Sequence, residues 1–300
     1  MTAPRQVLPG TTYLLTRRVA RRQLLLRPSE EVNQVFSYCF AHAAARAGVL
    51  LHAVAVLGNH VHAVLTDPDG RLPELTRWLF EYTAKCINVM HGRWENVWSS
   101  EPPSQVRLES PDVVVEKILY LMTNPIAAAL VARADRWPGV VTLPADYLRG
   151  GVEVKRPKVF FRENSPAPAT VTLKVVPPAG VEEKTPEAFV KMLSERLAQR
   201  EEELREKLRA EGRTILGPKA VKAQDPFSYP GGMEPRRNLK PRVAAANKWA
   251  RMEALGRLKS FDDTYPDARL RFLRGDRDVV FPAGTYWLVK HAGARCAAPG

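Results

Sequence analysis

The 300-residue sequence is poor in cysteine, containing only Cys39, Cys86 and Cys296. Without a CxxC pair, three cysteines do not build a disulfide framework or a cysteine-rich metal site. Cys39 and Cys86 fall on apolar faces of predicted helices, which is typical of reduced, buried thiols in a cytosolic protein. The sequence also lacks an apolar run as long as a membrane span, and its first residues lack the hydrophobic region of a signal peptide. We therefore expect a cytoplasmic protein without a membrane partner.

Acidic residues are scarce relative to basic ones. The chain has 32 Asp and Glu against 45 Lys and Arg, a formal net charge of +13. Such an excess favours a polyanionic partner, because cations that contact phosphates release condensed counterions. A basic surface can also serve solubility alone, so charge does not decide between the two interpretations. Hydrophobic residues make up 45% of the chain, which is enough to bury a core.

The first half of the sequence alternates between strand and helix patterns. Strands are predicted at residues 11–16, 51–57, 60–66 and 105–108, with Gly58 and Asn59 as a tight hairpin turn. Ser29 and Ser110 are candidate N-caps of helices, and the helix after Ser110 is expected to stop near Asn124, which precedes a proline. This order predicts an α+β fold with a ferredoxin-like antiparallel sheet, helices on one face and an extra helix at the end.

The composition changes after about residue 147, where prolines become frequent. We predict a first domain over residues 1–147 and an extension over residues 148–300 that is basic and partly helical. A charged helix is expected over residues 186–212, and residues 236–259 carry eight cations and Trp249. That basic segment could grip phosphates and stack a base of DNA, or it could be a surface helix whose Trp249 packs inward. The sequence leaves both interpretations open.

Two histidines, His60 and His62, lie two residues apart in the predicted hairpin strand. Because side chains alternate along a strand, both imidazoles emerge on one face and could share a cation. Paired histidines on a strand are also often only hydrogen-bonded surface residues. A metal site would need at least one further ligand from elsewhere in the fold.

Tyr120 and Asn124 are spaced four residues apart on a predicted helix, so they share one face. If that face meets the strand of the histidines, Asn124 could supply an oxygen ligand while Tyr120 lies beside the metal. The alternative is that Tyr120 is a core aromatic residue and Asn124 caps the helix before Pro125. Spacing alone does not choose between them.

The two motifs resemble a known family. The segment Val56-Leu57-Gly58-Asn59-His60-Val61-His62 is similar to the histidine–hydrophobic–histidine signature of HUH nucleases. The segment from Tyr120 to Ala127 resembles the tyrosine helix of REP-associated tyrosine transposases, which are relatives of single-tyrosine insertion-sequence transposases. Flanking segments match too, and the resemblance covers roughly the first 140 residues. This chain has Gly58 where the family often has proline.

The resemblance implies the HUH nuclease fold and a DNA nicking and joining activity. Tyr120 would be the catalytic nucleophile and would form a 5′-phosphotyrosine intermediate. Mg²⁺ or Mn²⁺ would be held by His60, His62 and Asn124. The partner would be single-stranded or hairpin DNA, and the protein would act as a monomer or a homodimer in transposition or recombination. Candidate contacts to the DNA backbone lie in an arginine-rich turn: Arg17, Arg18, Arg21 and Arg22.

Three alternatives remain at this point. A domesticated, non-mobile nuclease would have the same residues. A catalytically silent nucleic-acid-binding protein would keep the fold but would have no need of the complete set of four side chains. A metal-dependent hydrolase would use bound water and leave Tyr120 with a structural role.

Overall fold

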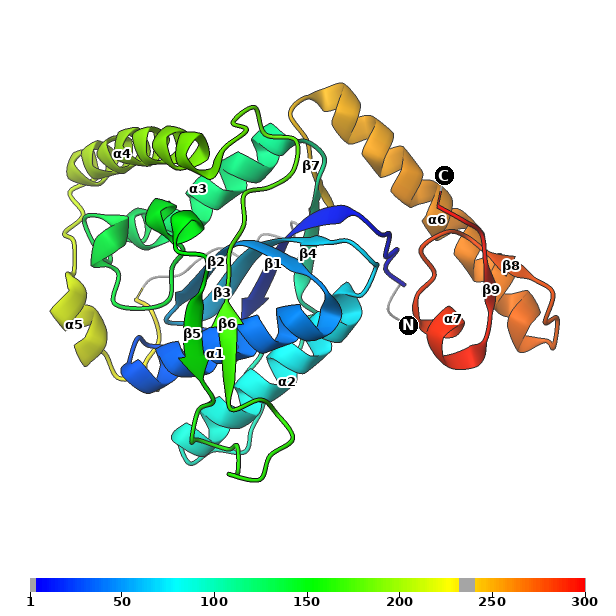
Figure 1. The fold of residues 1–300 in the computed structure, drawn as a ribbon, viewed down its shortest axis with the longest axis horizontal. Coiled ribbons are helices and arrows are strands. Elements are labelled where there is room, and N and C mark those ends of the chain that lie inside the picture. Colours follow the sequence, from blue (N-terminus) through cyan, green and yellow to red (C-terminus); the bar gives the residue numbers. More distant parts are fainter. Residues whose placement is uncertain (1–3, 232–240, 300) are drawn as a thin grey trace.

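The computed structural model describes residues 4–231 and 241–299 (Figure 1). Within these ranges the strands are β1 Thr11–Arg18, β2 Leu50–Leu57, β3 His60–Asp67, β4 Ser104–Leu108, β5 Val152–Lys155, β6 Thr170–Leu173, β7 Val243–Ala244, β8 Val280–Phe281 and β9 Arg295–Cys296. The α-helices are α1 Glu30–Ala47, α2 Leu72–Met90, α3 Pro111–Ala127, α4 Pro186–Ala210, α5 Pro218–Ala223, α6 Lys248–Leu273 and α7 Trp287–Ala292. Short 3₁₀ helices are η1 Ala20–Arg22, η2 Ala134–Arg136 and η3 Pro144–Leu148.

A five-stranded sheet in the order β2-β3-β1-β4-β7 forms the centre of the fold. The expected order of strands and helices in the first half is confirmed. The first four strands pair antiparallel, but β7 pairs parallel to β4, so the sheet is mixed and the expected antiparallel sheet is wrong at this edge. The N–H of Arg107 donates to the carbonyl of Arg242 over 2.9 Å, which gives the backbone of the edge strand a partner from far along the chain.

Helices cover both faces of this sheet, with α1 and α2 on one side and α3 on the other (Figure 1). The expectation of helices on one face is therefore wrong. The reason can be read in β2, where every residue from Leu51 to Leu57 is buried. A strand buried on both sides carries a continuous apolar run instead of an alternating one, and it needs a helix on each face.

Helix α3 continues through Pro125 to Ala127, three residues beyond its expected end. Proline removes only its own N–H from the helix, and in the last turn this costs one hydrogen bond. The helix persists because the N–H of Ala128 donates to the carbonyl of Asn124 over 3.1 Å. The predicted cap at its other end is confirmed, since Ser110 accepts from the N–H of Val113. Asn124 is therefore fully helical, one turn from Tyr120 on the same face.

The second half of the chain contributes to the main core. Phe189, Leu193 and Val221 are at most 1% exposed and belong to the same hydrophobic cluster as the sheet and α1 to α3. The N–H of Val176 donates to the carbonyl of Leu51 over 2.9 Å, which ties the segment after β6 to β2. The boundary at residue 147 stays a prediction, but it does not separate two hydrophobic cores.

The last part of the chain, α6 to β9, forms a smaller unit beside the sheet (Figure 1). We call residues 248–296 the C-terminal module. Its own hydrophobic cluster includes Phe272 and Phe281, separate from the main core. Trp249 at the start of α6 is 75% exposed, so the interpretation in which it packs inward is wrong. The predicted basic segment also includes Arg236, Arg237 and Lys240, which lie outside the described residues.

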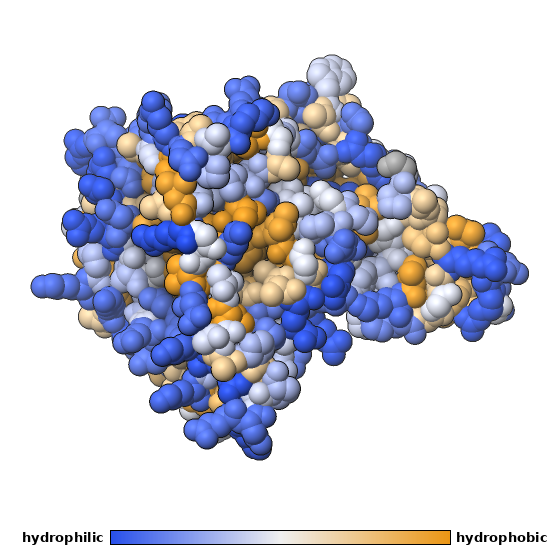
Figure 2. All heavy atoms as spheres, viewed as in Figure 1, coloured by the Kyte–Doolittle hydropathy of each residue, from blue (hydrophilic) through white to orange (hydrophobic). Residues whose placement is uncertain are grey.

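The surface is mostly hydrophilic around the rim of the face in Figure 2, with hydrophobic groups gathered in patches toward its middle. Among the described residues, none of the helices has the length and apolar character that crossing a membrane requires.

Candidate active site

The strand pair β1–β3 places the two histidines. Cα partners in this pair are Thr16 with His62 and Arg18 with His60, so these side chains emerge on the face of the sheet that α3 covers. The two imidazole rings lie side by side, with centroids 4.8 Å apart and planes at 81°. The sequence prediction that both histidines share one face is confirmed.

Each imidazole has a polar neighbour at Nδ1. The His62 Nδ1 lies 2.8 Å from the hydroxyl of Thr16, and the His60 Nδ1 lies 2.6 Å from Oδ1 of Asn59. The Nε2 atom of His62 is buried and has no hydrogen-bond partner among the described residues. A buried polar atom without a partner lowers the free energy of unfolding. A hydrogen-bond donor or a cation bound to the Nε2 lone pair would remove this cost. This pattern, with Nδ1 held and Nε2 open, is the one that orients a metal-binding histidine.

Both histidines are held neutral by their surroundings. Desolvation lowers the pKa of His60 to about 4, with Arg18 adding to the effect and a hydrogen bond to Asn124 opposing it. His60 still keeps part of its ring at the surface, whereas His62 is only 6% exposed. The pKa of His62 lies well below its ordinary value, through burial first and then the charges of His60 and Arg18. Neutral imidazoles can bind a cation without first losing a proton.

Helix α3 brings the other two predicted residues to the histidines. The ring of Tyr120 stands edge-on to His62, with centroids 5.5 Å apart. Asn124, one turn later, is close enough to His60 to form a side-chain hydrogen bond. Tyr120 is 44% exposed, so the alternative that it is a core aromatic residue is wrong. Four residues from β3 and α3 thus meet at one place, as the spacing in the sequence allowed.

Lysine and arginine side chains surround this site. The ammonium group of Lys117, one turn before Tyr120, lies 5.8 Å from the centre of the Tyr120 ring. Arg18, Arg22 and His60 line a cavity of about 280 Å³ beside the histidine pair, and none of its lining residues is acidic. A cluster of cations next to an exposed phenol can attract and hold a phosphate group.

The four candidate arginines are not equivalent. Arg17 and Arg18 belong to strand β1 and not to a turn, so they point to opposite faces of the sheet. Arg18 and Arg22 line the cavity beside His60, and Arg21 is exposed outside it. Arg21 and Arg22 both have positive φ, 54° and 61°, a strained conformation for residues other than glycine. This strained turn directs Arg22 to the site.

The hairpin turn of Gly58 and Asn59 is hydrogen-bonded to the segment that follows β1. The N–H of Leu26 donates to the carbonyl of Gly58 over 2.9 Å, and the N–H of Val19 donates to that of Asn59 over 2.8 Å. A Cβ atom at position 58 would lie 3.0 Å from Cδ2 of Leu24. Glycine at this position therefore permits the close packing of the two turns.

Sequence reasoning missed three contributors to the site: Thr16, Asn59 and Lys117. The spacing of Lys117, three residues before Tyr120, could have revealed it, and Asn59 adjoins His60 in the chain. Thr16 could not be found, because its contact depends on the register between β1 and β3. Among the described residues there is no cluster of three His, Cys, Asp or Glu side chains suited to a metal ion.

No protein-family model matches this chain, and no curated protein sequence matches it. Solved structures with similarity to this chain include the following two. One is a REP-associated tyrosine transposase bound to a REP hairpin, with a TM-score of 0.41 and 19% identity over 54% of this chain and 98% of the other. The second is a Deinococcus radiodurans protein described as a transposase, with a TM-score of 0.28 and 19% identity over 35% of this chain and 85% of the other.

Proposed function

We propose that this chain is a single-tyrosine DNA nicking and joining enzyme with the ferredoxin-like HUH fold, acting on single-stranded or hairpin DNA in transposition or recombination. The observation that carries the proposal is the meeting of an exposed Tyr120 with a histidine pair in which His62 presents a buried, unpartnered Nε2 atom. A purely structural arrangement would satisfy that atom and bury the phenol.

The residues fit a divalent cation. His60, His62 and Asn124 would hold it, because they offer two neutral nitrogens and one amide oxygen within one small region. Mg²⁺ or Mn²⁺ bound there would polarise the scissile phosphate as a Lewis acid. Asn59 and Thr16 orient the two rings by holding their Nδ1 atoms.

Tyr120 is the nucleophile in this proposal. Its phenolic oxygen forms a bond to phosphorus, the bond between phosphorus and the 3′-oxygen breaks, and the strand leaves with a free 3′-hydroxyl. The phenol proton passes to solvent water, and the leaving 3′-oxygen takes up a proton from solvent water. An unperturbed tyrosine has a pKa of about 10, so nearby positive charge must favour the phenolate. Lys117 supplies such charge from the protein.

The test is a covalent adduct. The full chain is incubated with end-labelled single-stranded hairpin DNA and Mn²⁺ or Mg²⁺, and the products are separated on a denaturing gel. We expect a protein–DNA adduct that disappears in Tyr120→Phe and with a chelator. Tyr82→Phe is a matched control, since Tyr82 lies on α2 on the other side of the sheet and stacks on Trp78.

The other outcomes separate the alternatives. Cleavage that persists in Tyr120→Phe would refute the nucleophile assignment and indicate hydrolysis by bound water. Binding without cleavage of any hairpin or single strand would indicate a silent DNA-binding protein. We further propose that the protein acts in the cytoplasm as a monomer or a homodimer, which analytical ultracentrifugation with and without DNA would decide.

A further inference from the structure

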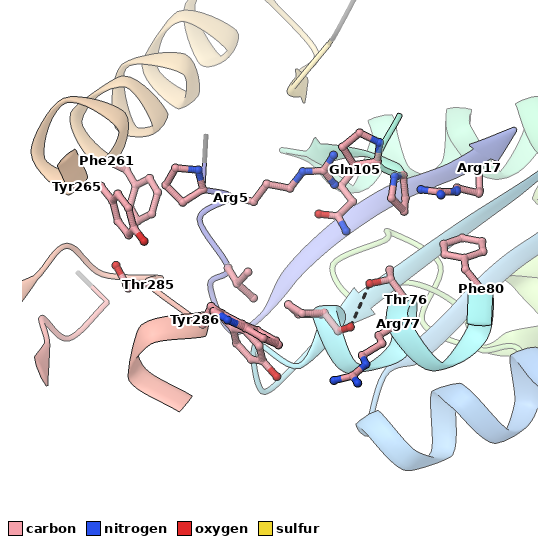
Figure 3. A pocket seen from close by; sticks show the side chains of 16 residues that line it. Arg5, Arg17, Thr76, Arg77, Phe80, Gln105, Phe261, Tyr265, Thr285 and Tyr286 are labelled. Carbon is pink, nitrogen blue, oxygen red and sulfur yellow. Dashed lines mark hydrogen bonds between the residues drawn. The ribbon is translucent and has the colours of Figure 1, made fainter. Parts of the chain in front are cut away.

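A second cavity lies on the other face of the sheet from the histidine pair. Its volume is about 470 Å³, and it opens between the first residues of the chain, helix α2 and the C-terminal module (Figure 3). Arg17 lines it, whereas the next residue, Arg18, lines the cavity of the candidate active site. The two cavities are thus distinct, and strand β1 provides one arginine to each.

The charge of this second cavity is uniformly positive. Arg5, Arg17 and Arg77 line it, and none of its lining residues is acidic. Figure 3 shows the side chains of Arg5 and Arg17 extending toward each other across the cavity. Among the described residues, no carboxylate forms an ion pair with any of the three, and Nε of Arg17 is buried without a hydrogen-bond partner.

This arrangement leaves positive charge uncompensated. The pKa of Arg17 is lowered by burial first and then by the charge of Arg5. Arg5 remains open to solvent through the cavity, yet the surrounding walls desolvate it enough to lower its pKa, and Arg242 adds to the effect. Holding like charges together in a partly desolvated place costs free energy unless an anion joins them. An anionic group placed between Arg5 and Arg17 would offset this cost.

The remaining walls are aromatic. Phe80 lies beneath Arg17, with the guanidinium carbon 5.6 Å from the ring centre. The C-terminal module contributes Phe261 and Tyr265 from α6 and Tyr286 and Trp287 from the start of α7 (Figure 3). Trp287 is 57% exposed, so one large flat surface is open to a ligand. Aromatic faces of this kind stack planar bases.

The aromatic wall is anchored to the first half of the chain. The hydroxyl of Tyr286 donates to a carboxylate oxygen of Glu74 on α2 over 3.1 Å, and Lys290 also bonds to Glu74. The N–H of Val7 donates to the carbonyl of Gly284 over 2.9 Å. These contacts cross from the C-terminal module to the N-terminal segment and α2. The cavity is therefore a built feature of the described fold.

We propose that this cavity binds a nucleotide unit, with its phosphate on Arg5 and Arg17 and its base against Trp287 and the neighbouring aromatic rings. A bare anion would not use the aromatic wall, and an apolar ligand would leave the arginines uncompensated. The volume lies within the usual range of small-ligand sites. The unit could be a free mononucleotide or one nucleotide of a DNA strand, because both carry the same phosphate and base.

The test measures binding in the full chain with Tyr120→Phe as background and a chelator present, so no cleavage contributes. Deoxyadenosine monophosphate and inorganic phosphate are titrated by calorimetry, and a fluorescein-labelled thymidine oligonucleotide is titrated by anisotropy. Test variants are Arg5→Gln and Trp287→Ala. Controls are Arg274→Gln and Trp94→Ala, which change exposed residues outside the cavity. Thermal unfolding checks that each variant is folded.

We expect each test variant to weaken nucleotide binding roughly tenfold, while both controls bind as the background does. A loss seen with the mononucleotide identifies a free nucleotide as the ligand, and a loss seen only with the oligonucleotide identifies a DNA strand. Unchanged affinities of both probes in both test variants would overturn the proposal. So would phosphate binding that Trp287→Ala does not alter and that equals nucleotide binding, because the base would then have no role. Since Tyr120 is absent throughout, either result leaves the proposed cleavage chemistry untouched.

Discussion

The hydroxyl of Thr16 offers a sharp test of the candidate metal site, because it contacts a ligand without being one. Its oxygen lies 2.8 Å from Nδ1 of His62 and fixes the orientation of that ring. In Thr16→Val the side chain keeps its shape and its place in β1 but loses the hydroxyl. We expect the free imidazole to lose its preferred rotation, with Nε2 no longer held toward the site.

The magnitude follows from the burial of the ring. His62 is 6% exposed, so its Nδ1 cannot exchange the lost hydroxyl for bulk water, and the unpaired atom should cost about 1–3 kcal/mol of folding free energy. Outer partners of metal-binding histidines typically contribute 10–100-fold in metal affinity, and we expect roughly that loss for Mn²⁺. Urea unfolding measures the first quantity, and Mn²⁺ titration followed by electron paramagnetic resonance measures the second.

Thr12→Val is the matched control. Thr12 lies on the same face of the same strand, and its hydroxyl forms a 2.7 Å hydrogen bond with the hydroxyl of Thr66. Thr66 retains a second partner, His52, so this control should cost only about 0.5–1.5 kcal/mol and leave Mn²⁺ affinity unchanged. The reasoning is refuted if Thr16→Val binds Mn²⁺ as the unmodified chain does, or if both variants lose the same affinity.

Three further results are expected from the contacts described above. Glu74→Gln should lower the melting temperature at neutral pH, because it removes a carboxylate that its neighbours stabilise. The pKa of Glu74 is lowered from 4.5 to about 2, chiefly by its hydrogen bond to Arg71. That stabilisation is complete above pH 4.5 and is lost as the pH falls toward 2, so circular dichroism melts of the two proteins should converge in acid. Phe189→Ala should cost about 3–5 kcal/mol in urea unfolding, because the ring is fully buried, whereas Trp249→Ala should be nearly neutral. Arg18→Gln should weaken DNA binding and reduce its salt slope by about one, and an equal effect of Arg21→Gln would contradict the division of the arginines.

The features that the sequence predicts correctly are local ones, within single strands and helices. Alternation along a strand is enough to place His60 and His62 on one face, and helical spacing is enough to align Tyr120 with Asn124. The cap at Ser110 follows from the preference of a serine hydroxyl for free N–H groups at a helix start. Each of these depends on neighbours within a few residues of the chain.

Tertiary structure decided the rest. The strand register that sets Thr16 against His62, the packing of α3 over the face that carries the histidines, and the parallel edge strand β7 all join segments far apart in sequence. So does the second cavity, whose walls come from the first residues, α2 and the C-terminal module. The physical reason is that an apolar face or an unpaired strand edge can be covered by any segment of suitable shape. No local sequence pattern specifies which distant segment covers it. Local patterns thus predict the histidine pair on β3 and the tyrosine–asparagine pair on α3, and the tertiary fold brings these two pairs together.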